Sequence, residues 1–451
     1  MNKVKTLIVI LLVMLLSTFS IFANGSGEKE SGKTVIKVAH IYDPMGGSGD
    51  KIGSEWFKGV KEEFESENPN IEVEFENFAW DQIDIKLMQD YRSGISDHDV
   101  AMLTPQLFAQ HREVGDLTDL TSYINKDWSS DEIDEFSWAS TYTQGNVKGQ
   151  QIAIPLGSHS RIMLFNKDMF KAAGLDPNDP PKTIDELIEY AKKLTVDTDG
   201  DGTIDQYGLA MALGPDRGTI ELTFGPLIWN YGGELWDSAN NKADIDSPEA
   251  IKTAELIWDL LHTYKVVNPA SPVNDMTVNL FNTTMNEKAA IILGWGSYWV
   301  GSLEEQGYVK GVIPPSVDAE LVKVGFAQYP TTAQAGFTNS WGVGIYQKSA
   351  NKDAAWKFIN YMLRKNNLRS FPDAGLPIRK SEWQTPEYQT EYYQTYFEAI
   401  KLGKPMPVTP YYGELADVVS AALQTCMNGD REDIPQILKT AENEFNSKYE
   451  N

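Results

Sequence analysis

The chain contains very little cysteine and comparatively little positive charge. Cys426 is the single cysteine among 451 residues, so no disulfide can form within one chain. A lone cysteine late in a sequence is most often a small core residue. Lysine and arginine number 39 against 64 aspartates and glutamates, and the formal net charge is −25. This balance argues against nucleic acid or an anionic membrane as the binding partner.

Familiar catalytic motifs are missing as well. The sequence has no Gly-x-Ser-x-Gly elbow, no His-Glu-x-x-His and no Cys-x-x-Cys. Its histidines lack the spacing of metal ligands and stand at His40, His98, His111, His159 and His262. A glycosidase, however, needs only two carboxylates that face each other across a cleft. A secreted carbohydrate-active enzyme therefore stays open as an alternative interpretation.

Long apolar runs are absent except at the amino end. Met1–Ala23 begins with two lysines, continues with the apolar run Leu7–Leu16 and ends in small residues, which predicts a secretory signal peptide. An uncleaved anchor is the alternative, but the apolar run is short for a membrane span. Residues 24–33 are polar and rich in glycine and serine, so we expect a disordered linker.

Strand and helix patterns alternate in the first part of the mature chain. The sequence predicts strands at Thr34–Ala39, Ile71–Phe75 and Asp99–Leu103, separated by helical patterns with apolar residues on one face. Strand–helix–strand–helix order is typical of a parallel α/β sheet. Much later in the chain the sequence predicts a strand over Gly336–Tyr346, returning toward the first core, and a helix over Lys352–Leu363.

The stretch from Gly145 to Leu194 is the most informative part of the chain. Gln151–Ile154 predicts a short strand that stops at Pro155, and Ile162–Phe165 predicts a second strand. The run Gly157–Ser160 between them is small and polar, which is poor for a strand interior. Two apolar strands joined by a polar passage suggest a chain that leaves one core and enters another. A Thr-x-x-Glu capping box starting at Thr183 predicts a helix.

This stretch resembles the extracellular solute-binding proteins of ABC importers, especially the sugar-binding family. The similarity rests on an Ile-Pro strand end, then Phe-Asn-Lys-Asp-Met-Phe-Lys-Ala-Ala-Gly-Leu, and then Pro-Pro-Lys-Thr before a helix. A later Lys-Ala-Ala segment that precedes Trp295 and a Gly-x-Pro-x-Arg turn ending at Arg379 extend it over nearly the whole mature chain. The resemblance implies binding and delivery of a sugar or oligosaccharide to membrane permease subunits, without catalysis.

The resemblance also implies the architecture. We expect a periplasmic-binding-protein-like α/β fold with two lobes joined by a multi-crossing hinge, and the ligand cleft between them. The expected N-terminal lobe is 34–156 plus 342–366, and the C-terminal lobe is 157–341 plus 367–451. Many relatives carry a lipid-anchoring cysteine just after the signal, where this chain has Asn24-Gly25-Ser26. We therefore expect a soluble, monomeric protein in the periplasm or outside the cell.

Aromatic side chains beside polar ones are the best candidates for contacts with sugar, because sugar rings present apolar C–H faces. Several tryptophans stand at predicted element ends, and positions matched to the family add residues from the loops after the first and third strands and from the crossing. The predicted ligand-binding residues are Tyr42, Asp43, Trp80, Gln106, His159, Ser160, Trp229, Trp295, Trp299, Asn339 and Trp341. Maltose-type relatives carry an acid at the crossing, so His159 argues against maltose itself. Trp56, Trp258 and Trp356 fall on apolar helix faces and are assigned to the core.

An acidic loop follows the central stretch. Asp197, Asp199, Asp201 and Asp205 occupy positions 1, 3, 5 and 9 of an EF-hand-type loop, with a carbonyl available from Thr203 at position 7. Position 12 is glycine instead of glutamate. The pattern predicts a structural Ca²⁺ site, and an acidic surface turn is the alternative. A third interpretation of the chain, an adhesion module, would require repeats of this loop, and the sequence has only one.

Overall fold

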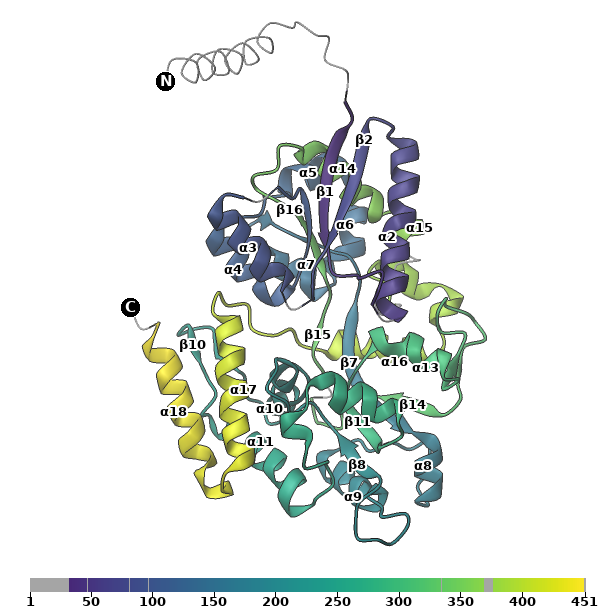
Figure 1. The fold of residues 1–451 in the computed structure, drawn as a ribbon, viewed down its shortest axis with the longest axis vertical. Helices are drawn as coiled ribbons and strands as arrows, with labels where there is room; N and C mark the ends of the chain where they lie inside the picture. Colours follow the sequence, from purple (N-terminus) through teal and green to yellow (C-terminus); the bar gives the residue numbers. More distant parts are fainter. Residues whose placement is uncertain are drawn as a thin grey trace, which may run out of the picture.

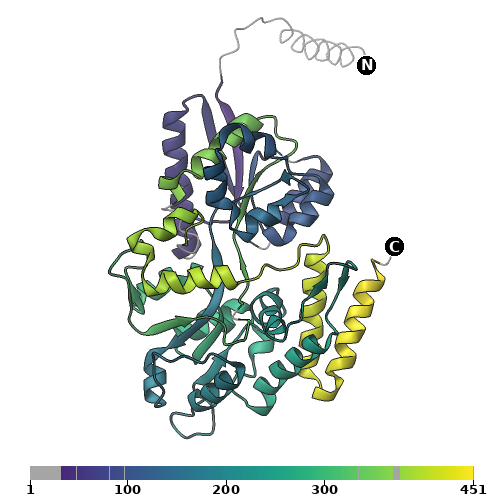
Figure 2. The same ribbon diagram turned by 180° about the vertical axis from the view of Figure 1, so that it is seen from behind.

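The computed structural model describes residues 32–46, 48–80, 82–95, 97–333, 335–368 and 376–449. They form two α/β lobes, one above the other in Figures 1 and 2. The predicted signal peptide and nearly all of the predicted linker lie outside the described residues. Within the described part of the chain, no helix is both long enough and apolar enough to cross a bilayer.

The first lobe is built on a five-stranded sheet. Its order is β2 (Ile71–Asn77), β1 (Thr34–His40), β3 (Val100–Leu103), β16 (Gly342–Ile345) and β6 (Ile154–Pro155). Strand β1 runs parallel to β2 and β3, as the strand–helix alternation predicts, whereas β16 is antiparallel to both of its neighbours. Pro155 lies in the edge strand, where the missing N–H of proline does not break the ladder.

Helices cover both faces of this sheet (Figure 1). Phe64 of α2 and Phe358 of α14 meet edge to face with ring centroids 5.1 Å apart, so distant parts of the sequence share one core. The predicted helix at Lys352 is confirmed by α14. The helical elements of this lobe are α2 (Ser48–Glu67), α3 (Ile83–Ser93), η1 (Pro105–Leu107), α4 (Phe108–Val114), α5 (Thr121–Asp127), α6 (Ser130–Ser137), α7 (Ser140–Gly145), α14 (Lys352–Met362) and α15 (Lys365–Leu368).

The second lobe contains a sheet of order β14 (Val324–Ala327), β7 (His159–Asn166), β11 (Ala289–Gly296) and β8 (Tyr207–Ala210). Strand β7 is antiparallel to β11 and β14, and all eight of its residues are buried. Its first two residues also pair with β15 (Thr338–Asn339).

The largest group of helices belongs to this lobe. The predicted cap of α9 is half confirmed: Thr183 Oγ1 accepts from Glu186 N at 3.2 Å, but Glu186 Oε2 accepts from Lys182 N instead of Thr183 N. The helical elements are α8 (Lys167–Ala172), α9 (Ile184–Leu194), η2 (Thr219–Phe224), α10 (Gly225–Asn230), α11 (Pro248–Trp258), η3 (Asp259–Thr263), η4 (Ser271–Val273), η5 (Thr277–Asn282), α12 (Thr283–Met285), η6 (Ser297–Trp299), α13 (Val300–Glu305), η7 (Lys380–Gln384), η8 (Pro386–Tyr388), α16 (Glu391–Leu402), α17 (Tyr412–Asn428), η9 (Arg431–Asp433) and α18 (Ile434–Ser447).

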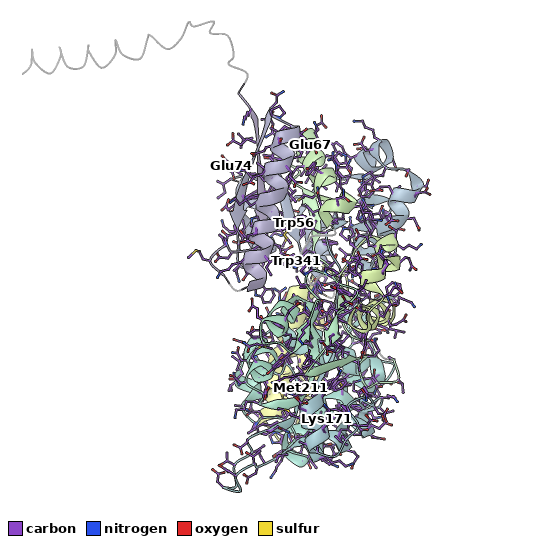
Figure 3. The ribbon with its side chains drawn as sticks, turned by 90° about the vertical axis from the view of Figure 1, so that its right-hand side faces the viewer. Trp56, Glu67, Glu74, Lys171, Met211 and Trp341 are labelled. Carbon is purple, nitrogen blue, oxygen red and sulfur yellow. The ribbon has the colours of Figure 1, made fainter. Side chains whose placement is uncertain are left out.

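Among the described residues, two extended passages join the sheets of the two lobes. The chain leaves β6 after Pro155 and enters β7 at His159, and it returns from Asn339 in β15 to Gly342 in β16. The passages run side by side, because Leu156 N donates to Trp341 O at 2.8 Å. Trp341 is labelled near the junction of the lobes in Figure 3, and Met211 lies inside the second lobe.

Three local expectations are wrong. Gln151 belongs to a small hairpin of β4 (Asn146–Val147) with β5 (Gln150–Gln151), so 151–154 is not one strand. His159 and Ser160 lie inside β7, because pairing with β15 supplies the backbone partners that their composition did not suggest. The expected single strand over 336–346 is divided into β15 and β16, one for each lobe.

Candidate functional site

A buried polar cluster bridges the two lobes at the passages. Gln106 of η1 donates through Nε2 to Glu221 Oε1 of η2 at 3.3 Å, and its Oε1 accepts from Asn339 Nδ2 of β15 at 3.0 Å. Tyr412, the first residue of α17, donates to Glu221 Oε1 at 2.7 Å. These four residues, called here the bridging cluster, join the first lobe, one passage and two elements of the second lobe. The structure thus brings Gln106 and Asn339 into contact.

The position of Gln106 follows from its short helix. Pro105 starts η1, Leu107 packs into the core of the second lobe, and Phe108 packs into the core of the first. Thr104 just before it is held by Asp84, which accepts from the Thr104 backbone N at 3.0 Å and from its hydroxyl at 2.7 Å. A polar side chain on η1 is therefore fixed at the boundary between two apolar cores.

Asp84 is held in turn by a buried histidine. His111 Nε2 lies 3.0 Å from Asp84 Oδ1, and its Nδ1 lies 2.9 Å from Asp116 Oδ2. Both ring nitrogens face carboxylate oxygens, so both carry hydrogen and the ring is an imidazolium. Burial alone would lower the pKa of His111, but hydrogen bonds and charge from the two aspartates raise it to about 9.

His159 and Ser160 lie at the start of β7, beside the bridging cluster. His159 is the register partner of Asn339, and its Nδ1 accepts from Arg161 Nη1 at 3.2 Å. Burial and the neighbouring Arg161 charge hold the pKa of His159 well below its usual value, so the ring is neutral. The Ser160 hydroxyl donates to Phe337 O at 3.4 Å.

Trp80 marks a second contact between the lobes. It follows β2, is 48% exposed, and has the guanidinium carbon of Arg217 at 5.7 Å from its ring centroid. Arg217 precedes η2 of the second lobe. The geometry is that of a cation–π contact across the lobe boundary.

Trp295 and Trp299 form a pair at the end of β11, with ring centroids 5.0 Å apart. Trp295 has no exposed surface, whereas Trp299 is partly buried. The buried Nε1 of Trp295 has no hydrogen-bond partner in the described part of the chain. In this conformation neither face of the Trp295 ring is offered to solvent.

The other predicted ligand residues lie apart from the bridging cluster or at its edge. Tyr42 is buried in the first-lobe core with its ring 5.9 Å from Phe57, and Asp43 is exposed and accepts from Met45 N at 2.8 Å. Trp229 is buried in α10, and Trp341 is partly buried in the second passage. Of the tryptophans assigned to the core, Trp56 and Trp356 are buried, as predicted, but Trp258 is only partly buried.

Three of the four aspartates of the acidic loop come together. Carboxylate oxygens of Asp197, Asp199 and Asp205 lie within 4.8 Å of one another. Backbone N–H groups, chiefly that of Gly202, lower the pKa of Asp197, and the Thr198 hydroxyl lowers that of Asp205. Asp201 is not part of this group and accepts from Thr203 N at 2.7 Å. The loop thus presents ionised oxygen ligands of the kind that hard cations prefer.

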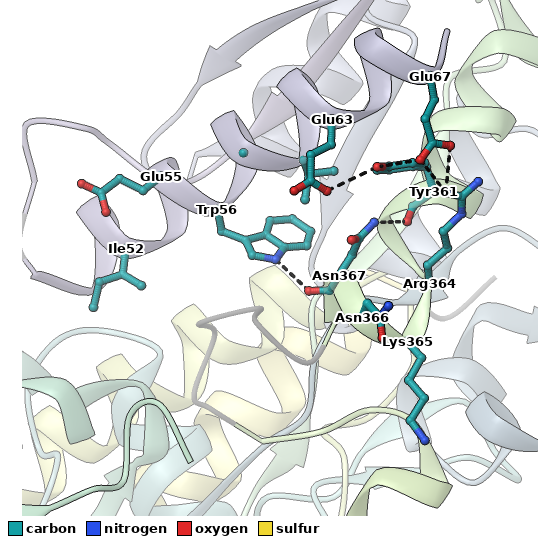
Figure 4. A pocket seen from close by; sticks show the side chains of 12 residues that line it. Ile52, Glu55, Trp56, Glu63, Glu67, Tyr361, Arg364, Lys365, Asn366 and Asn367 are labelled. Atoms are coloured by element: carbon teal, nitrogen blue, oxygen red, sulfur yellow. Dashed lines mark hydrogen bonds and ion pairs between the residues drawn. The ribbon is translucent and has the colours of Figure 1, made fainter. Parts of the chain in front are cut away.

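A separate hollow lies on the first lobe between α2 and α15, with a volume of about 830 Å³ (Figure 4). Its polar groups bind one another. Arg364 pairs with Glu67 at 3.0 Å, the Tyr361 hydroxyl lies 3.3 Å from Glu63 Oε2, and Trp56 Nε1 donates to Asn367 O at 2.9 Å. All residues that line the hollow belong to the first lobe, so a solute bound there would not contact both lobes.

Sequence reasoning missed four polar residues at the junction, namely Arg161, Arg217, Glu221 and Tyr412. Arg161 had a visible signal, since it is a cation directly before the apolar run Ile162–Phe165. Glu221 stands between the apolar residues Ile220 and Leu222 in η2. Neither position can be assigned to the lobe boundary before the passages are known.

Comparison with protein families decides the classification. The model of the bacterial extracellular solute-binding proteins matches residues 47–367, more than two thirds of the chain. The chain belongs to this family. A binding protein of Brucella abortus (strain 2308) is 26% identical over 384 residues, which cover 84% of this chain and 86% of that protein.

Solved structures of solute-binding proteins share the fold of this family member. A Thermotoga lettingae solute-binding protein bound to α-D-tagatose superposes with a TM-score of 0.75 at 22% identity, covering 92% of this chain and 99% of that one. The Listeria monocytogenes substrate-binding protein Lmo0181, in complex with cycloalternan, gives 0.74 at 22% identity with the same coverage. The expected periplasmic-binding-protein-like fold is confirmed.

Proposed function

We propose that this solute-binding protein captures a sugar or oligosaccharide between its lobes and delivers it to the permease of an ABC importer. The bridging cluster is the observation that carries the proposal. It places amide, carboxylate and hydroxyl groups from both lobes at one point beside the passages, and a ligand that contacts both lobes must favour their closure. The ligands named for the Thermotoga and Listeria structures are both carbohydrates.

The contact residues are proposed in two groups. Gln106, His159, Ser160 and Asn339 supply polar contacts at the passages, together with Glu221. Aromatic surface comes from Trp80, Trp299 and Trp341, which keep some exposure, and from Trp295 if opening of the lobes uncovers it. Tyr42, Asp43 and Trp229 complete the proposed set. The protein acts as a soluble monomer in the periplasm or outside the cell.

The test begins with the ligand that the protein itself retains. Mass spectrometry of protein purified under native conditions identifies that ligand, and calorimetry then measures its affinity. Gln106→Ala should weaken binding about tenfold, the value of one good hydrogen bond in a desolvated site. Gln436→Ala on the exposed side of α18 is the matched control and should bind as wild type does. Retention of a non-carbohydrate solute, or equal affinities in both variants, would reject the proposal.

Trp295 needs a gentler substitution than alanine. Because the ring has no exposed surface, Trp295→Ala removes core volume as well, which typically costs about 3–5 kcal/mol of stability. Trp295→Phe keeps an aromatic face and most of the volume, so stability and affinity can be read separately. An affinity unchanged in a folded Trp295→Phe protein would remove this residue from the proposed stacking surface.

The alternative of a glycosidase makes an opposite prediction. Incubation with a panel of glycosides and oligosaccharides should give no turnover by the solute-binding protein. Steady release of reducing sugar at enzyme-like rates would overturn the proposal in favour of the enzyme.

A structural Ca²⁺ in the acidic loop is a further part of the proposal. Asp197, Asp199 and Asp205 would supply carboxylate oxygens, and Asp201 and the Thr203 carbonyl would complete the set. The gathering of three carboxylates in one loop supports it, because like charges at this spacing repel one another unless a cation neutralises them.

A further inference from the structure

Arg161 is a buried cation that the fold leaves without a counter-charge. It lies on β7, close to the point where that strand enters the second lobe, and it is 7% exposed. Its Nη1 donates to neutral His159, and its buried Nε has no partner among the described residues. No aspartate or glutamate of the described chain forms an ion pair with it. A buried charge without compensation is costly, so its presence needs an explanation.

Aromatic rings and neutral phenol groups surround Arg161. The Tyr298 ring centroid lies 4.9 Å from the guanidinium carbon, and that of Phe337 lies 5.8 Å away. Burial raises the pKa of Tyr329 and of Tyr396, and the charge of Arg161 opposes the shift in both. Both phenols therefore stay neutral near the guanidinium. Aromatic faces attract the cation without neutralising it.

The Nε–H of the Arg161 guanidinium is an open donor, because it is buried and has no hydrogen-bond partner among the described residues. Buried polar groups are normally satisfied, and a group left open in the protein alone points to water or a ligand. A charged donor left open in this way favours an anionic acceptor.

Arg161 is also connected to the lobe boundary. It donates to His159, whose register partner Asn339 contacts Gln106 of the first lobe. We propose that the ligand of this protein is an acidic sugar, a uronate or an oligosaccharide containing one, and that Arg161 binds its carboxylate. The planar guanidinium matches a carboxylate in shape and charge. This inference rests on the proposed capture of a carbohydrate between the lobes and specifies its class.

The overall charge of −25 does not oppose this assignment. Surface charges are screened over about 8 Å at physiological salt, whereas a buried contact is screened much less. Neutral sugars need no cation in their site, and an acidic protein that binds an anion does need one.

The experiment compares acidic and neutral sugars that differ only at the carboxylate. Calorimetry is run with D-glucuronate, D-galacturonate and their disaccharides, and with the corresponding neutral sugars, on wild type, Arg161→Gln, Arg161→Lys and Arg364→Gln. Wild type should bind at least one acidic probe at least about tenfold more tightly than its neutral counterpart. Arg161→Gln should remove that preference, Arg161→Lys should retain part of it, and the exposed Arg364→Gln should leave it unchanged.

Three outcomes would overturn the inference. Equal affinity of wild type for acidic and neutral sugars rejects it and leaves carbohydrate capture intact. A preference for the acid that persists in Arg161→Gln rejects the role of Arg161. Absence of binding by every probe also contradicts it, and the ligand retained on native protein then decides the wider proposal: a neutral sugar keeps it, and a non-carbohydrate rejects it. If Arg161→Gln fails to fold, the wild-type preference and the lysine variant still decide the matter.

Discussion

In the described part of the chain, buried cations have acidic partners in the first lobe but not in the second. In the first lobe His111 lies between Asp84 and Asp116, and Arg379, which is 6% exposed, pairs with Glu132 through two nitrogens and donates to Leu363 O. In the second lobe Arg161 is equally buried and has a neutral histidine and two aromatic rings instead of an acid. The first arrangement is complete without any ligand, and the second is not. A buried cation that is paired with acidic side chains stabilises the folded protein. A buried cation without an acidic partner beside the lobe boundary can instead pair with a ligand.

Removing the histidine from its complete arrangement should have the largest effect. His111→Ala leaves Asp84 and Asp116 buried without their cation, and breaking a buried ion pair in this way typically costs about 3–5 kcal/mol. Denaturant unfolding of the ligand-free protein measures the loss of free energy. Because Asp84 also holds Thr104, the variant should in addition loosen η1 and weaken ligand binding.

Arg161→Met is the matched comparison for that experiment. It removes an uncompensated charge and keeps an apolar chain of similar length, so the ligand-free protein should unfold at the same free energy or a higher one. If His111→Ala and Arg161→Met lose the same free energy of unfolding, the two buried cations do not differ in how the fold compensates their charge.

The stability of the first lobe should also depend on pH in a predictable direction. The folded pKa of His111 is raised to about 9, above its ordinary value of 6.5. A raised folded pKa gives a stabilisation that is fully present below pH 6.5 and is lost as the pH rises through 9. The contribution is on the order of 3 kcal/mol. Unfolding of wild type and of His111→Ala between pH 6 and pH 10 measures it, and the two curves should converge at the alkaline end. Parallel curves would contradict the imidazolium assignment.

Chelation should produce a smaller change, confined to the second lobe. If Ca²⁺ binds the acidic loop of the folded state, a concentration one hundred times the dissociation constant stabilises by about 2.7 kcal/mol. A chelator should therefore lower the melting temperature of wild type and leave the Asp199→Ala, Asp201→Ala double variant unaffected. The same chelator effect on both proteins would remove the site.

The sequence predicted the elements better than the contacts between them. The strands at Thr34, Ile71 and Asp99 and the helix at Lys352 could be recognised because each follows a local pattern of apolar residues. The sequence pattern puts His159 and Ser160 outside a strand, because their partner strand β15 lies almost 180 residues away and no local pattern indicates the pairing. Long separations along the chain also hid Glu221, which is 115 residues from Gln106, and Tyr412, which is 191 residues from Glu221. The acidic loop, by contrast, is local, and spacing alone predicted that Asp197, Asp199 and Asp205 lie together, whereas Asp201 lies outside their group.

The contact between Trp80 and Arg217 should give the smallest effect, and it sharpens the comparison because this cation is only partly buried and its aromatic partner is exposed. An exposed cation–π contact contributes about 0.5–1 kcal/mol, which corresponds to a roughly two- to fivefold change in an equilibrium between closed and open lobes. Energy transfer between dyes on Ile95→Cys and Val273→Cys, both at exposed positions in different lobes, reports that equilibrium. Cys426 should not compete for the dyes, because it is buried and burial raises the pKa of its thiol to about 12. Trp80→Ala and Arg217→Gln should each favour the open arrangement in the absence of ligand, and the double variant should open no further than either alone. Additive opening would mean that the two residues act separately, and a loss of ligand affinity far above fivefold in Trp80→Ala alone would assign its ring to the ligand instead of to Arg217.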